Sequence, residues 1–194
     1  MSVFQMYLEL GITHIADFNA FDHILFLISL MASFQFYQWR KILKLITAFT
    51  LGHSISLALS VLNIVQFSIP IIELLIPVTI FLTALVNLIN VERITAKSYI
   101  YEYLITLIFG IIHGMGFSVL LSSLLGVEES IIGPLAAFNI GIEIGQILIV
   151  FLILSLEFLF IKYLNIKQLF WKFALSFMAL ISSIYLILDR WPFY

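Results

Sequence analysis

The sequence contains no cysteine, and only 10% of its 194 residues are charged. Without cysteine there can be no disulfide bonds and no thiolate ligands for a metal. The formal net charge of -2 gives no basic surface, which excludes nucleic acid as a partner. The start of the chain also lacks a basic region and a small-residue cleavage site, so we expect no cleaved signal peptide.

Hydrophobic residues, by contrast, make up 63% of the chain, and the mean hydropathy is +1.17. The remaining polar residues are too few to coat a water-soluble globule of this length. The apolar runs are much longer than the roughly 10 residues of a membrane-spanning strand. The composition therefore predicts an all-α integral membrane protein surrounded by the lipid bilayer, with residues 1–194 forming one transmembrane domain.

Six apolar segments reach the roughly 20 residues that a helix needs to cross a hydrocarbon core about 30 Å thick. They cover residues 21–38, 42–63, 70–90, 99–125, 133–161 and 169–189. The stretch VFQMYLELGITHI that precedes them is apolar but too short to span the membrane. We expect this stretch to form a short interfacial or re-entrant helix. The prediction is a bundle of six transmembrane helices.

Lysine and arginine occur almost entirely in alternate connections between these segments. Eight of the nine basic residues follow this pattern: Arg40, Lys41, Lys44, Arg93, Lys97, Lys162, Lys167 and Lys172. Basic residues mark the cytoplasmic side of multi-pass membrane proteins. Both termini are therefore predicted to lie on the non-cytoplasmic side, and we expect the membrane to be a bacterial inner membrane.

Ionisable side chains occur in and beside the apolar segments, although each costs about 2.5–3.5 kcal/mol at the membrane centre. At a rise of about 1.5 Å per residue, His53 and His113 lie roughly 17 and 21 Å from the cytoplasmic side. Glu143 lies about 15 Å from the opposite side by the same rise. Six residues can therefore meet in the outer half of the membrane, and we take them as candidate metal ligands. They are His14, Asp22, His23, His53, His113 and Glu143.

Further polar residues accompany these candidates. In FNIGIEIGQILIV, Asn139, Glu143 and Gln146 share one helical face because they are spaced at i, i+4 and i+7. Gly141 and Gly145 lie on the other side, where small residues permit close contact with a neighbouring helix. We expect supporting or pathway roles for the polar residues Asn139, Gln146, Thr50, Ser54 and Glu73.

Four histidines and nearby carboxylates without sulfur suit a borderline divalent transition-metal ion, such as zinc, nickel, cobalt or ferrous iron. A carboxylate would offset the charge of the ion in a low dielectric. Each histidine also has a structural interpretation, because a single intramembrane histidine often links helices by hydrogen bonds. Four histidines at compatible depth favour a shared metal site over four separate links.

Four blocks of the chain resemble the HupE/UreJ family of hydrogenase and urease accessory membrane proteins: GITHI…FDHILFL, TAFTLGHSISL, FGIIHGMGF and NIGIEIGQ. Members of this family are regarded as secondary permeases for nickel or cobalt. The resemblance implies a metal-handling set of Asp22, His23, His53, His113 and Glu143. His14 lies further from the Asp22–His23 pair than in the family pattern, so the metal need not be nickel.

Three functions remain open at this point. The resemblance favours a secondary permease for a divalent metal ion, driven by an ion gradient, the membrane potential or a partner. The clustering of polar groups in the outer half favours an intramembrane hydrolase, in which bound zinc activates water against a lipid or amide. A membrane assembly factor whose metal only stabilises the bundle is the third. We take transport as the main hypothesis, and the sequence leaves open whether the chain forms a homo-oligomer.

Overall fold

A computed structural model describes residues 2–17, 21–65, 68–90, 96–125 and 130–191, without the side chains of 96–99 and 119. The described residues form helices and contain no β-strand. In chain order the helices are α1 (Val3–Ile15), α2 (Asp22–Met31), the short 3-10 helix η1 (Phe36–Gln38), α3 (Trp39–Val61), α4 (Ile69–Ile89), α5 (Ala96–Leu125), α6 (Ile132–Tyr163) and α7 (Gln168–Asp189). The predicted all-α class is confirmed.

Helices α3 to α7 are each long and apolar enough to cross a membrane. They correspond to five of the six predicted spans. The first predicted span, residues 21–38, is corrected: its α-helix has only 10 residues and ends at Met31. At about 1.5 Å per residue, α2 is about 15 Å long, half the thickness of a hydrocarbon core.

The apolar run continues past Met31, so hydropathy alone could not reveal where α2 ends. Side-chain hydrogen bonds hold the chain in a turn at this point. Ser33 donates a hydrogen bond to the side chain of Asn87 on α4 over 2.7 Å. Gln35 and Gln38 form a capping box that starts η1, which leads directly into α3. The residues after Ser33 therefore lead through η1 into α3 and do not extend α2 into a long first span.

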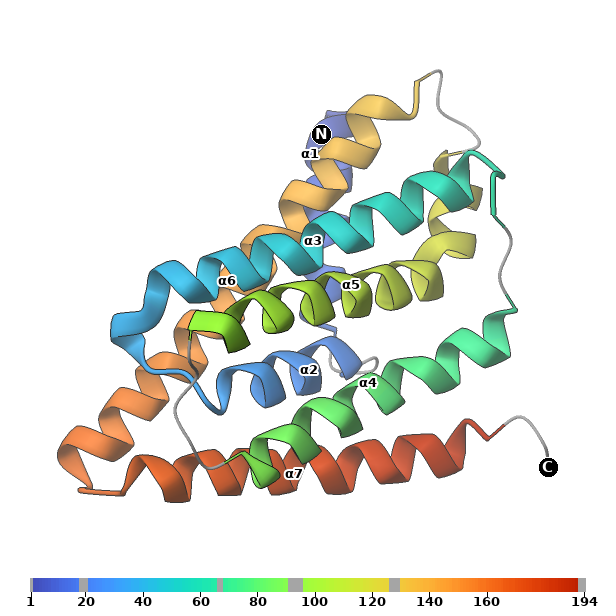
Figure 1. Cartoon of the computed structure of the whole chain (residues 1–194). Coiled ribbons are helices and arrows are strands. Elements are labelled where there is room, and N and C mark those ends of the chain that lie inside the picture. Colours follow the sequence, from blue (N-terminus) through green and yellow to red (C-terminus); the bar gives the residue numbers. More distant parts are fainter. Residues whose placement is uncertain (1, 18–20, 66–67, 91–95, 126–129, 192–194) are drawn as a thin grey trace.

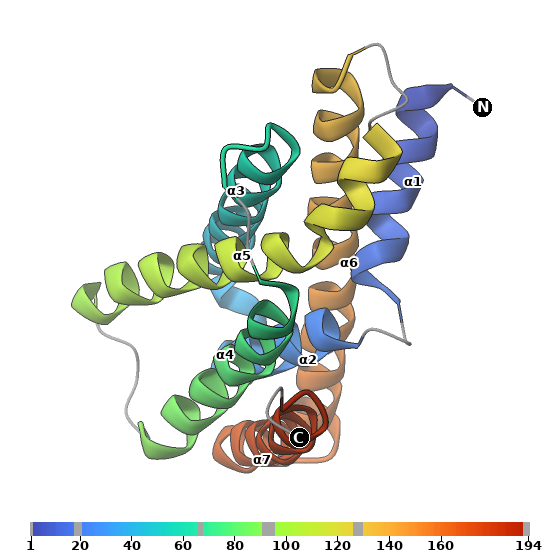
Figure 2. The ribbon, with the colours of Figure 1, turned by 90° about the vertical axis from the view of Figure 1, so that its right-hand side faces the viewer.

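The helices pack mainly as three pairs, α3 with α5, α1 with α6, and α4 with α7 (Figure 1). The short helix α2 lies among them and contacts α4, α6 and α7 (Figure 2). α1 packs chiefly along α6. The helix predicted for the start of the chain is therefore present, and α2 is a separate short helix that begins at Asp22.

Glycine residues bring the backbones of two of these pairs into direct contact. A Cβ atom on Gly52 of α3 would lie 2.1 Å from the carbonyl oxygen of Leu107 on α5. A Cβ atom on Gly141 of α6 would lie 2.2 Å from the carbonyl oxygen of Leu8 on α1. Such close approach is possible only without a side chain, as in small-residue interfaces of membrane helices. The close contact predicted at Gly141 is confirmed, and its partner is α1.

The basic segments gather at one end of the bundle. The start of α3 and the turn between α6 and α7 both lie toward the left of Figure 1, and a hydrogen bond of 3.0 Å joins the side chain of Gln35, just before η1, to that of Gln168, the first residue of α7. Arg190 follows the last residue of α7, at the opposite end. Arg93 lies outside the described residues. Which end faces the cytoplasm stays a prediction.

Candidate metal centre

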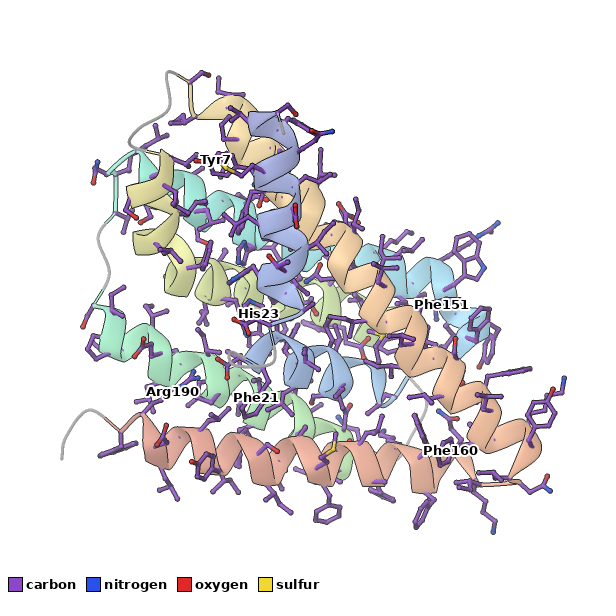
Figure 3. All side chains as sticks on the ribbon, turned by 180° about the vertical axis from the view of Figure 1, so that it is seen from behind. Tyr7, Phe21, His23, Phe151, Phe160 and Arg190 are labelled. Carbon is purple, nitrogen blue, oxygen red and sulfur yellow. The ribbon has the colours of Figure 1, made fainter. Side chains whose placement is uncertain are left out.

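Three histidines from three different helices meet inside the bundle. His14 lies one residue before the end of α1, His23 is the second residue of α2, and His53 is in the middle of α3. One nitrogen atom of each lies within 4.8 Å of the nitrogen atoms of the other two. The end of α1 and the start of α2 thus bring two of the histidines together, and Figure 3 shows His23 near the start of α2.

Five ring nitrogens of these histidines have no hydrogen-bond partner among the described residues. Both ring nitrogens of His23 and of His53 are buried without a partner in the described structure, as is Nε2 of His14. Buried polar atoms in proteins are nearly always paired, because an unpaired one costs about 1–3 kcal/mol. The side chain of His53 has no exposed surface at all. The structural interpretation, in which each histidine links two helices, does not account for these five nitrogen atoms.

His113 on α5 lies next to the trio. Its ring centroid is 5.3 Å from that of His23, and its Nδ1 is 2.8 Å from the carbonyl oxygen of Phe109. Nδ1 therefore carries the proton and donates a hydrogen bond to this carbonyl. The lone pair of the ring is then on Nε2. That Nε2 atom is buried and has no partner in the described structure. His113 thus lies beside the trio with a ring nitrogen that is free among the described residues, although the group of three close nitrogen atoms does not include it.

The geometry of the trio fits a transition-metal ion. A tetrahedral ion with nitrogen ligands at about 2.0–2.1 Å separates these nitrogens by about 3.3 Å. The three nitrogen atoms lie within 4.8 Å of one another, so a bound ion would draw them closer by up to about 1.5 Å. The set has no sulfur and is rich in imidazole, which suits zinc, nickel or cobalt.

Asp22, the first residue of α2, is held by an arginine. Arg190 donates from Nη2 to Oδ2 of Asp22 over 2.9 Å. The other carboxylate oxygen of Asp22, Oδ1, is buried and has no partner in the described structure. Nη1 of Arg190 donates to the backbone carbonyl of Glu73 over 3.4 Å, whereas the Glu73 residue itself is exposed. Glu73 therefore contacts Arg190 through its backbone carbonyl.

Glu143 and its neighbours contact α3 in a different place. The Thr47 hydroxyl donates to Oε1 of Glu143 over 2.8 Å, and the Thr50 hydroxyl donates to Gln146 over 2.9 Å. Thr47 precedes His53 by six residues, about 9 Å of helix rise. The carboxylate is therefore in a seam between α3 and α6 and outside the group of histidine nitrogens.

The two remaining polar candidates bond within their own helices. Ser54 donates its hydroxyl hydrogen to the carbonyl of Thr50 over 2.7 Å. The Asn139 side-chain amide donates to the carbonyl of Leu135 over 2.9 Å, and its Oδ1 atom is buried without a partner in the described structure. Neither side chain contributes to the trio.

Phenylalanine rings surround the histidines, which the sequence analysis did not anticipate. The contacting rings are Phe26, Phe49, Phe117 and Phe138. Helical spacing could have identified three of them. Phe26 follows His23 by three residues, Phe49 precedes His53 by four, and Phe117 follows His113 by four, so each shares a helix face with a histidine. These rings form an apolar wall around the buried imidazoles.

Arg190 is a further residue that the sequence analysis missed. The signal was present in the charge pattern, because Arg190 is the one basic residue outside the eight that mark the predicted cytoplasmic end. A basic residue at the opposite end has no role in the orientation rule. Its ion pair with Asp22 places its guanidinium beside the residue that precedes His23.

A comparison with protein families finds one whose description is HupE / UreJ protein, and its model matches residues 1–189. No curated protein and no solved structure matches the chain. The family match covers all the helices described above, including the three that carry the buried histidine trio. This multi-pass membrane protein therefore belongs to the HupE/UreJ family.

Proposed function

We propose that the protein is a secondary permease for a divalent transition-metal ion of the nickel, cobalt and zinc class. The observation that carries the proposal is the buried trio of His14, His23 and His53, whose nitrogen atoms lie within 4.8 Å of one another. His113 and Asp22 are the proposed additional ligands. The metal ion is the substrate. These groups replace the water molecules bound to the ion, and a rearrangement of the helices then releases it on the other side of the membrane.

The distribution of the histidines over separate helices supports transport. His14 is on α1, His23 on α2 and His53 on α3. α1 packs chiefly along α6, whereas α2 contacts α4, α6 and α7. A movement of α1 relative to α2 or α3 would change the distances between these ligands, so one arrangement of the helices could bind the ion and another release it.

A series of polar groups continues from the histidines toward the basic end of the bundle. Asn87 of α4 donates to the carbonyl of Ser29 over 2.6 Å and accepts from Ser33. Beyond them, Glu157 of α6 is buried and accepts hydrogen bonds from the Gln35 side chain and the Phe36 backbone. A transport path must be polar on both sides of its binding site, and we propose that these groups form the second half of the path. Catalysis needs a single opening only.

The proposed path gives roles to three further residues that the sequence analysis selected. Gln146 and Thr50 position α6 against α3 through their hydrogen bond. Glu143, half-buried in the same seam, is the proposed carboxylate that the ion meets after leaving the trio. With the basic end in the cytoplasm of a bacterial cell, both termini lie outside and the ion moves inward.

One observation favours the alternative of a zinc-dependent hydrolase. Oδ1 of Asp22 is a buried carboxylate oxygen without a partner in the described structure, beside the residue His23. Such an oxygen can take a proton from a metal-bound water. The pairing of the same carboxylate with Arg190 weakens it as a base, because a neighbouring cation disfavours protonation.

The proposal is tested by metal uptake into liposomes that contain the purified protein and a metal-sensitive dye. We expect His53→Ala and His23→Ala each to lower the initial uptake of Ni²⁺, Co²⁺ or Zn²⁺ at least tenfold. Ser54→Ala is the matched control, because its hydroxyl bonds only to its own helix in the described structure. Undiminished uptake in both histidine variants overturns the proposed site. Tight zinc that never exchanges, without any uptake by the wild type, favours the hydrolase.

A further inference from the structure

Arg190 reaches the metal centre from the end of the chain. The residue caps the last turn of α7, with its backbone N–H bonded to the carbonyl of Leu186. Its guanidinium forms the ion pair with Asp22 and lies between α7 and α4 in Figure 3. The side chain of Arg190 is 24% exposed, whereas that of Asp22 is 10% exposed. The arginine is therefore more exposed than the carboxylate that it holds.

The charges at this position decide what the ion pair does. Asp22 directly precedes His23 in α2, but its oxygens lie outside the group of nitrogen atoms that the trio forms. Asp22 and Arg190 both act electrostatically on His113, whose ring centroid is 5.3 Å from that of His23. A divalent ion bound between the trio and His113 would have the same sign of charge as the guanidinium and would be attracted to the same carboxylate.

We propose that Arg190 is a tethered counter-cation that holds Asp22 while the site is empty and gives it up when a divalent ion binds. The arginine then turns toward solvent at its own end of the bundle, and Asp22 offers its oxygens to the ion. Return of the guanidinium to Asp22 lowers the affinity for the ion and promotes its release. This inference rests on the proposed function, because it assigns a regulation to the same metal site.

A purely structural ion pair would behave differently. In that case Arg190 only ties the end of α7 to the start of α2 and to the Glu73 carbonyl of α4. Loss of Arg190 or loss of Asp22 would then loosen the site, so each single substitution would weaken metal binding. Competition predicts opposite signs, because removing the arginine removes a repelling charge and frees a carboxylate.

A double-mutant cycle separates the two roles. Co²⁺ affinity is measured by calorimetry for the wild type, R190Q, D22N and D22N/R190Q, with R190K as the control that keeps the charge. We expect R190Q to bind Co²⁺ at least tenfold more tightly and D22N at least tenfold more weakly. The double variant, which restores the charge balance, and R190K should both remain within about threefold of the wild type.

A second measurement uses the wild type alone, so it does not depend on the folding of a variant. Saturating Co²⁺ should raise the rate at which an arginine-specific reagent, phenylglyoxal, modifies Arg190, as followed by mass spectrometry. An unchanged or slower rate overturns the inference, and so does weaker or unchanged Co²⁺ binding by R190Q. If the wild type binds no divalent ion, the proposed function itself fails. Co²⁺ binding without the predicted response of Arg190 refutes only the tethered counter-cation.

Discussion

The same substitution, glycine to alanine, should have opposite effects at two positions of this bundle. At Gly52 the new Cβ atom would lie 2.1 Å from the Leu107 carbonyl oxygen, whereas ordinary contact begins at 3.4 Å. The α3 and α5 backbones would have to separate by about 1.3 Å, because a backbone carbonyl cannot rotate away. At Gly133, near the start of α6, the new atom meets nothing within 4 Å.

These distances give approximate magnitudes. Overpacking of this kind costs up to about 3 kcal/mol, and the helix preference of alanine over glycine returns about 1 kcal/mol. Gly52→Ala should therefore lower the free energy of unfolding by about 2 kcal/mol, whereas Gly133→Ala should leave it unchanged or raise it by up to about 1 kcal/mol. Because His53 directly follows Gly52, the affinity for Co²⁺ should also fall at least tenfold in the first variant.

Thermal unfolding in detergent measures the stability of both variants, and calorimetry measures their Co²⁺ affinity. Equal melting temperatures for Gly52→Ala and Gly133→Ala would refute the backbone contact between α3 and α5. A destabilised Gly52→Ala variant with normal Co²⁺ affinity would refute the argument that this contact sets the position of His53.

Two further predictions concern polar groups away from the histidines. Asn87→Leu removes the hydrogen bonds to Ser29 and Ser33, so liposome uptake should slow at least tenfold while Co²⁺ affinity stays within about twofold. Weakened binding with normal uptake would contradict a role in the path. Thr50→Val and Gln146→Leu should each destabilise the protein, whereas the double variant should recover about 0.6–2 kcal/mol of the summed loss. Strictly additive changes in chemical unfolding would show that the hydrogen bond between these residues contributes nothing.

Much of the fold follows from the sequence because hydropathy reports directly on the cost of placing a residue in lipid. Helices α3 to α7 were predicted to within a few residues for this reason. The exception, 21–38, is instructive. Its apolar composition continues through Phe36, but the side chains of Ser33 and Gln35 bond to α4 and η1 and end the helix. Such tertiary hydrogen bonds leave no mark on a hydropathy profile.

The candidate site was predictable in its residue types but not in its exact membership. Depth along each helix correctly suggested that the histidines could meet, and three of them do. Depth alone could not distinguish His14, which joins the trio, from Glu143, which pairs with Thr47 in another seam. That difference depends on which face of α6 meets α3 and on the path of the chain between α1 and α2. Helix rotation and crossing angle fix both, and neither is encoded in a local pattern.

X-ray absorption of the purified protein loaded with Co²⁺ or Ni²⁺ tests the histidine trio most directly. The spectrum should show at least three imidazole nitrogens at about 2.0–2.1 Å from the ion. Replacing His14, His23 and His53 together by alanine should abolish this signature. An ion surrounded only by oxygen, or an unchanged spectrum in the triple variant, would contradict a metal centre built from these three residues.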